Sequence, residues 1–180
     1  MTTTIERTTT ETTVRVALCR DDRGISIATS VPFLDHMLTT LARYAGMGMR
    51  VEARGDLRHH IVEDVAICVG RAFAAFAPDA RARFGERTVP MDDAVVQCVL
   101  DLGGRAYYRG SLPSGMYEHW MRSFADSAGA TLHLRVLRGQ DRHHIIEAAF
   151  KSLGLSLAQA LMPSDAVFST KGAAVLRENA

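Results

Sequence analysis

The 180-residue sequence predicts an α/β (α+β) sandwich that is built from two β-β-α-β-α repeats. Segments of alternating apolar and polar residues predict strands, and segments with helical spacing separate them. Both halves of the chain follow the same order, and each carries the string His-His-x-x-Glu, which begins at His59 and at His143. Because the elements, their order and these unusual residues recur together, we expect a duplicated unit whose long helices cover one face of the sheets.

The first repeat is expected to occupy residues 1–80. Its pattern predicts, in order, strands 12–19 and 25–31, a helix 33–46, a strand 49–54 and a long helix 56–77. Residues 20–24 (Arg-Asp-Asp-Arg-Gly) have the composition of a turn between the first two strands. Gly46 suits the end of the first helix, because glycine readily adopts the left-handed C-cap conformation, and Pro78 ends the second helix.

The second repeat is expected to occupy residues 81–180. Its pattern predicts, in order, strands 94–102 and 105–110, a helix 116–129, a strand 131–139 and a long helix 141–161. Gly103 and Gly104 suit a turn, and Pro163 follows the last helix. We expect residues 77–89 to connect the two repeats, and the repeats to pack as one domain.

The composition excludes several classes of partner. A net charge of +1 and the lack of any long basic tract argue against nucleic acid and anionic membranes. No apolar run reaches the roughly 18 residues that cross a bilayer, and the Thr-rich N-terminus lacks the apolar region of a secretory signal. The isolated Cys19, Cys68 and Cys98 are interpreted as buried free thiols. We therefore expect a cytoplasmic protein.

The histidines follow the duplication. His36 stands 23 residues before His59, His119 stands 24 residues before His143, and only His133 falls outside the repeated set. Eight residues thus recur as candidate metal ligands: His36, His59, His60, Glu63, His119, His143, His144 and Glu147. A single helical histidine is more often an ordinary surface or hydrogen-bonded residue. Adjacent imidazoles, however, repel when protonated and are costly to bury without a partner, so the recurring set indicates divalent metal binding.

Helical spacing divides each cluster between two ions. Residues i and i+4 share one face of a helix, whereas residue i+1 points about 100° away. His143 and Glu147 can therefore bind one ion, and His144 faces another; the first repeat has the same spacing. The string differs from the zincin motif His-Glu-x-x-His, since no second histidine lies at i+4. Imidazole ligands alone would favour zinc.

At these residues the sequence resembles the imidazoleglycerol-phosphate dehydratase family. The resemblance extends over nearly the whole chain. It is carried by the strings RTTTET (7–12), FLDHML (33–38), HHIVED (59–64), RFG (83–85), MDDAVVQCVLDLGGRAY (91–107), GQDRHHIIEAAFK (139–151) and STKG (169–172). It implies two ribosomal protein S5 domain 2-like repeats, two Mn²⁺ ions per active site, and a homo-oligomer of 24 subunits with active sites at the interfaces.

The resemblance also implies an activity and roles for single residues. The activity is dehydration of D-erythro-1-(imidazol-4-yl)glycerol 3-phosphate to 3-(imidazol-4-yl)-2-oxopropyl phosphate in L-histidine biosynthesis, through a metal-bound imidazolate. Glu11 matches the acid–base residue of the family. The residues that match the family's phosphate-binding set are Arg83, Arg105, Ser169 and Lys171.

Two departures from the family pattern leave alternatives open. The string GDLRHH (55–60) is about three residues shorter than usual, and Tyr44 stands where a second histidine of the substrate site is usual. One alternative is a related metal-dependent lyase or hydrolase that acts on another phosphorylated azole. A second, non-enzymatic alternative is a structural shell that metal ions hold together. Turnover of imidazoleglycerol phosphate separates these three hypotheses.

Overall fold

Each half of the chain forms one four-stranded sheet and two helices. The computed structural model describes residues 2–77 and 81–164. The first half comprises β1 (Thr2–Thr8), β2 (Thr12–Cys19), β3 (Ile25–Ala28), α1 (Pro32–Ala45), β4 (Gly48–Gly55) and α2 (Arg58–Phe76). The second half comprises β5 (Phe84–Met91), β6 (Ala94–Leu102), β7 (Tyr107–Arg109), α3 (Gly115–Ala128), β8 (Ala130–Arg138) and α4 (Arg142–Ala160).

The two sheets have the same topology. Their strand orders are β1-β2-β4-β3 and β5-β6-β8-β7, and in each sheet only the last pair is parallel. The predicted β-β-α-β-α order is therefore confirmed in both halves. Each repeat has one further strand at its start, namely β1 and β5, which the sequence analysis missed.

The missed strands are edge strands whose sequences are polar. β1 carries one aliphatic side chain, that of Ile5, and was interpreted as part of a polar terminus. Backbone pairing with β2 forms it, and Arg7 Nε donates to the buried carboxylate of Asp64 on α2 at 2.9 Å. β5 begins within the segment that we expected to be a connection. There Gly85 lets α4 approach closely, since an added Cβ would lie 2.0 Å from the carbonyl oxygen of Ser156.

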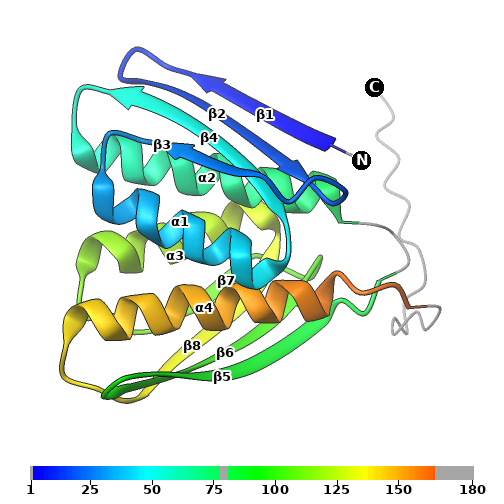
Figure 1. The fold of residues 1–180 in the computed structure, drawn as a ribbon, viewed down its shortest axis with the longest axis vertical. Coiled ribbons are helices and arrows are strands. Elements are labelled where there is room, and N and C mark those ends of the chain that lie inside the picture. Colours follow the sequence, from blue (N-terminus) through cyan, green and yellow to red (C-terminus); the bar gives the residue numbers. More distant parts are fainter. Residues whose placement is uncertain (1, 78–80, 165–180) are drawn as a thin grey trace, which may run out of the picture.

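The helices lie between the two sheets, as Figure 1 shows. α2 packs on the inner face of the first sheet, and α4 packs on the inner face of the second. Helices of opposite repeats also meet, α1 against α4 and α2 against α3. Large aromatic side chains fill the space between the helices: Phe73 on α2 and Phe124 on α3 have ring centroids 6.0 Å apart, and Trp120 on α3 and Phe150 on α4 are 4.7 Å apart. This pairing brings the ends of the helices of opposite repeats together.

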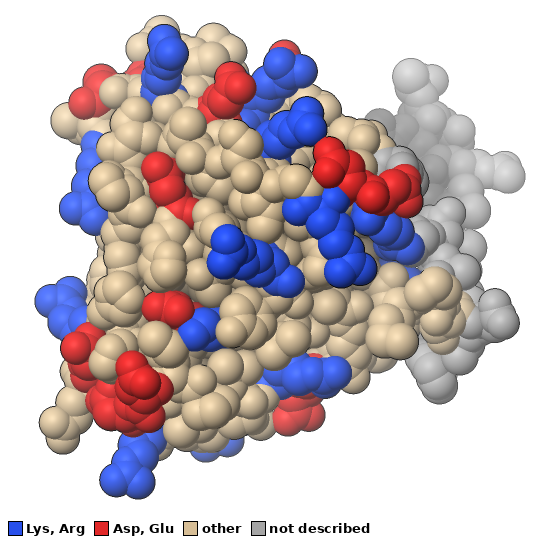
Figure 2. All heavy atoms as spheres, viewed as in Figure 1, with Lys and Arg blue, Asp and Glu red and all other residues tan. Residues whose placement is uncertain are grey.

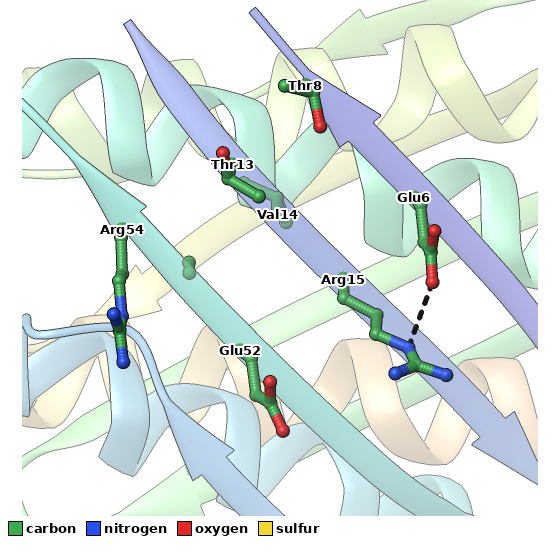
Figure 3. Close-up of a pocket in the computed structure, with 8 residues that line it drawn as sticks. Glu6, Thr8, Thr13, Val14, Arg15, Glu52 and Arg54 are labelled. Atoms are coloured by element: carbon green, nitrogen blue, oxygen red, sulfur yellow. Dashed lines mark ion pairs between the residues drawn. The ribbon is translucent and has the colours of Figure 1, made fainter.

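No helix in the described parts of the chain is long and apolar enough to span a membrane. The outer face of the first sheet is polar instead. A shallow depression of about 370 Å³ lies there over β1, β2 and β4, where Arg15 and Glu6 form a 3.1 Å ion pair (Figure 3). No histidine lines this depression, so the candidate chemistry of the chain lies elsewhere.

The cysteines give a first testable expectation. Cys68 and Cys98 are buried, which raises the pKa of their thiols to about 11 and about 12. Cys19 is half-buried, and a hydrogen bond from Thr2 lowers the pKa of its thiol. Because the thiolate is the reactive form, a disulfide reagent should rapidly modify one thiol per folded chain and all three after denaturation. Rapid modification of more than one thiol in the folded protein would contradict the burial of Cys68 and Cys98.

Candidate metal centre

Two groups of ligand atoms meet where helices of opposite repeats pack. The first, here cluster A, comprises His36, His143 and Glu147; the second, cluster B, comprises His59, Glu63 and His119. In each cluster the ligand atoms all lie within 4.8 Å of one another.

Cluster A joins α1 to α4. His143 Nε2 lies 3.1 Å from Glu147 Oε2, as the i,i+4 spacing predicts. His36 Nε2, from the other repeat, lies 3.3 Å from the same oxygen. The second carboxylate oxygen of Glu147 is 2.9 Å from Lys151 Nζ. Burial alone would raise the pKa of Glu147, but the hydrogen bonds from Lys151 and His36 outweigh it and lower the pKa.

Cluster B joins α2 to α3 in the same way. His59 Nε2 lies 3.7 Å from Glu63 Oε2, and His119 Nε2 lies 3.3 Å from Glu63 Oε1. The rings of His59 and His119 are stacked with centroids 5.3 Å apart. Each cluster therefore takes its i,i+4 pair from one repeat and its third ligand from the short helix of the other repeat.

The donor atoms of these clusters fit a divalent cation. His119 Nε2 is buried and makes no hydrogen bond, although a carboxylate oxygen of Glu63 lies near it. A buried nitrogen without a partner is costly in a folded protein, and a bound cation removes that cost. Two imidazole nitrogens and one carboxylate oxygen converge in each cluster, which is a common ligand set of transition-metal ions.

The remaining two histidines of the repeated set point elsewhere. His60 Nδ1 lies 2.8 Å from Asp56 Oδ1, and His144 Nδ1 lies 2.7 Å from Asp93 Oδ1. Neither His60 nor His144 contributes an atom to cluster A or cluster B. Adjacent histidines therefore point in different directions, and that they face different ions stays a prediction.

Glu147 and His144, on two faces of α4, should therefore bind different ions. Glu147→Ala removes the carboxylate of cluster A, whereas His144→Ala leaves both clusters intact and removes a ligand that faces away from them. We expect each variant to lose part of its bound metal and the double variant to lose more than either. Elemental analysis of the purified proteins measures this. A double variant that retains as much metal as Glu147→Ala would show that His144 and Glu147 do not bind different ions.

Glu11 lies beside one of the outward-facing histidines. It is in the turn between β1 and β2, its side chain is 54% exposed, and Oε2 lies 3.6 Å from His60 Nδ1. Its backbone carbonyl accepts the N–H of Asp56 at 3.1 Å, which ties the turn to the start of α2. A carboxylate in this position can exchange protons with a molecule that approaches His60.

The arginines expected to bind phosphate lie at the other end of α4. The backbone N–H of Arg83 donates to the carbonyl of Ala160, and its guanidinium pairs with both carboxylate oxygens of Asp101 at 2.6 and 2.9 Å. Since α4 has 19 residues and rises by about 1.5 Å per residue, Arg83 lies roughly 25 Å from His143. A small substrate cannot bridge that distance within one subunit.

Of the other residues expected to bind phosphate, Arg105 lies near Arg83, and two lie outside the residues that the structure describes. Arg105 lies three residues beyond the end of β6, and its side chain is exposed. Its backbone carbonyl accepts a hydrogen bond from the hydroxyl of Thr131 at 2.8 Å. Ser169 and Lys171 lie outside the described residues. The structure thus brings the metal ligands together in two clusters and separates Arg83 and Arg105 from them.

Sequence analysis missed three polar side chains that contact the site. Asp56 and Asp93 hold the rings of His60 and His144, and Lys151 holds Glu147. The i,i+4 spacing of Asp56 with His60, and of Glu147 with Lys151, could have identified two of them. Tyr44, the departure from the family pattern, lies beside Lys151, whose Nζ is 5.7 Å from its ring centroid.

Comparison with known proteins gives one consistent result. The family model for imidazoleglycerol-phosphate dehydratase matches residues 29–157. An imidazoleglycerol-phosphate dehydratase from Pyrobaculum aerophilum is 47% identical, over 92% of this chain and 96% of the relative. The crystal structure of this enzyme (IGPD) from Pyrococcus furiosus in complex with (S)-C348 has a TM-score of 0.86 and 38% identity, covering 93% of this chain and 99% of that one.

A second solved structure agrees. The imidazoleglycerol-phosphate dehydratase of Staphylococcus aureus superposes with a TM-score of 0.82 at 31% identity, covering 91% of this chain and 100% of that one. The matches span both repeats and therefore both clusters of histidine and glutamate ligands. With its duplicated fold and these matches over nearly its full length, the chain belongs to the imidazoleglycerol-phosphate dehydratase family.

Proposed function

We propose that clusters A and B hold the two divalent ions, Mn²⁺, with which this enzyme of histidine biosynthesis removes water from D-erythro-1-(imidazol-4-yl)glycerol 3-phosphate. The product is 3-(imidazol-4-yl)-2-oxopropyl phosphate. The observation that carries the proposal is the pair of three-ligand clusters, each joining both repeats, in a chain of this family. The two repeats, residues 1–80 and 81–180, then act as one domain, because neither repeat alone completes a cluster.

The residues that would hold the ions are those of the two clusters, together with His60 and His144 from a neighbouring copy. A divalent ion bound there supplies Lewis-acid stabilisation to an imidazole that has lost its proton. Manganese is the choice that the family implies, while the donor set of two imidazoles and one carboxylate would also suit zinc.

The protein must also move a proton on carbon. When the hydroxyl group leaves the carbon next to the imidazole, the neighbouring C–H bond breaks, and the resulting enol becomes the ketone. Glu11 accepts that proton through its carboxylate, since it is an exposed acid beside His60 and, unlike Asp56, makes no hydrogen bond with that ring. Its free access to solvent and its place at the tip of the β1–β2 turn support this role.

The phosphate end of the substrate needs cationic partners. Arg83 and Arg105 supply them in this proposal, with Ser169 and Lys171. Because Arg83 lies roughly 25 Å from His143 along α4, the imidazole and the phosphate bind to residues of different subunits. We therefore propose a homo-oligomer, of 24 subunits as in the family, with active sites at its interfaces and a cytoplasmic location.

Turnover of the substrate by stripped and reloaded protein tests the proposal. Chelation should abolish the dehydration of imidazoleglycerol phosphate, and added Mn²⁺ should restore it. Inactive protein that binds the metal fully would favour the structural-shell alternative. Activity only on a different phosphorylated azole would favour the related lyase or hydrolase.

Arg105→Ala should mainly weaken substrate binding. Loss of one hydrogen bond between charged groups costs about 1.5–3 kcal/mol, so the Michaelis constant should rise by about 10- to 150-fold. Arg54→Ala, on the outer face of the first sheet, is the matched control and should change nothing (Figure 3). Steady-state kinetics decide the matter: an unchanged Michaelis constant would show that Arg105 does not bind the phosphate.

A further inference from the structure

We propose that Asp56 and Asp93 are positioning residues that hold His60 and His144 with the Nε2 atom of each ring turned toward a metal ion. The inference rests on the proposed function, because it assumes that these two histidines bind ions. It assigns a role to two carboxylates that belong to neither cluster. The same hydrogen bond, from Nδ1 to a carboxylate, is made once in each repeat.

In the first repeat the carboxylate comes from the start of the same helix. Asp56 Oδ1 lies 2.8 Å from His60 Nδ1 and also accepts the backbone N–H of Leu57 at 2.6 Å. An ionised carboxylate only accepts, so the neutral ring of His60 carries its hydrogen on Nδ1 and leaves the lone pair on Nε2. Glu11 is farther from the same nitrogen, at 3.6 Å, and makes no hydrogen bond with it in the described structure.

In the second repeat the carboxylate comes from the β5–β6 hairpin. Asp93 Oδ1 lies 2.7 Å from His144 Nδ1, and its other oxygen accepts the backbone N–H groups of Gln140 and Asp141 at 2.7 and 3.2 Å. Asp93 is therefore held by three hydrogen bonds, one of which comes from the ring of His144.

The duplication alone does not account for this recurrence. In the repeat alignment Asp141 stands near the place of Asp56, but Asp141 caps α4 by accepting the N–H groups of His143 and His144. α2 has no side-chain cap, and Asp56 holds the ring of His60 instead. The short GDLRHH string brings Asp56 within one helical turn of His60. Unrelated positions thus supply the same contact, as expected if the ring orientation itself is required.

The end of the molecule where α4 begins and the β5–β6 hairpin turns is acidic. Figure 2 shows acidic side chains gathered there, at the lower left. Asp92, next to Asp93 in the chain, faces the opposite nitrogen of the same ring, with Oδ2 3.3 Å from His144 Nε2. Its side chain is 68% exposed, against 43% for Asp93, and no hydrogen bond fixes it in the described structure. Asp93 orients the ring, while Asp92 stands on the side that an ion would occupy.

Titration of the reconstituted protein with Mn²⁺ tests the proposal without measuring turnover. Carboxylates that orient metal-binding histidines typically contribute about 10- to 100-fold to metal affinity. We expect Asp93→Ala and Asp56→Ala each to weaken the binding of an ion by that factor. Asp93→Asn keeps an acceptor and should lose less. Glu52→Gln is the matched control, because Glu52 lies on the outer face of the first sheet and belongs to neither cluster, and its affinity should equal that of the wild type.

A double-mutant cycle with His144→Ala separates positioning from a structural role. If Asp93 acts through the ring, Asp93→Ala should cause no further loss of affinity once His144 is absent. An equal further loss in the His144→Ala background would show that Asp93 only supports the loop before α4, and would overturn the proposal. Unchanged affinity of Asp93→Ala would also overturn it. Protein that binds Mn²⁺ as expected but does not dehydrate the substrate would refute the proposed function and leave this inference standing.

Discussion

Glu11→Gln should lower the turnover of imidazoleglycerol phosphate by about 10²- to 10⁴-fold, the usual contribution of a general acid or base. Glutamine keeps the size and polarity of glutamate but cannot accept the proton from carbon. The side chain of Glu11 is 54% exposed and lies outside both clusters, so folding and metal content should be unchanged. Steady-state kinetics, circular dichroism and elemental analysis on the same preparation measure the three quantities.

The matched control is Glu52→Gln. Glu52 is an exposed carboxylate too, but it stands on β4 and lies on the outer face of the first sheet, away from His60 (Figure 3). This control should retain full activity. If Glu11→Gln is as active as Glu52→Gln, Glu11 takes no part in the proton transfer.

Removal of the metal should break the oligomer into smaller species. His60 and His144 belong to neither cluster of their own chain, and the phosphate candidates lie roughly 25 Å from cluster A along α4. Ions shared between subunits explain both facts. Because such ions bind the assembled form more tightly than the separated subunits, their binding free energy stabilises the assembly.

Light scattering on stripped and reloaded protein measures this effect. Chelation at neutral pH should reduce the particle mass several-fold, and Mn²⁺ should restore it. The double variant His60→Ala/His144→Ala is the control, and its mass should stay small with or without Mn²⁺. A wild-type mass that does not change after verified loss of metal would show that the ions do not join subunits.

The pattern of the sequence predicts the inner strands better than the outer ones. β2 and β6 alternate apolar and polar residues because one face of each packs on a helix, and this alternation is visible in a single sequence. β1 and β5 lie at sheet edges, where strands carry more polar residues. Their formation depends on pairing with β2 and β6, and on contacts such as Arg7 with Asp64, which local periodicity does not reveal.

The same division applies to the site. Helical spacing predicts that His143 and Glu147 share a face, because that contact is local. It does not predict that His36 joins them, because His36 arrives through the packing of α1 against α4 across the two repeats. Asp93 reaches His144 from a hairpin 51 residues earlier, which is again a contact of the folded chain. Contacts within one helical turn can thus be predicted from the sequence, and contacts between elements require the fold.

The most direct test of the account is a count of bound ions. Elemental analysis of Mn²⁺-reconstituted protein should give two ions per chain, one for each cluster. His119→Ala removes the ligand that α3 contributes to cluster B, and His36→Ala removes the ligand that α1 contributes to cluster A. Each variant should retain about one ion per chain. A wild-type protein that holds fewer than two ions, or a His119→Ala variant that still holds two, would contradict the assignment of both clusters as metal sites.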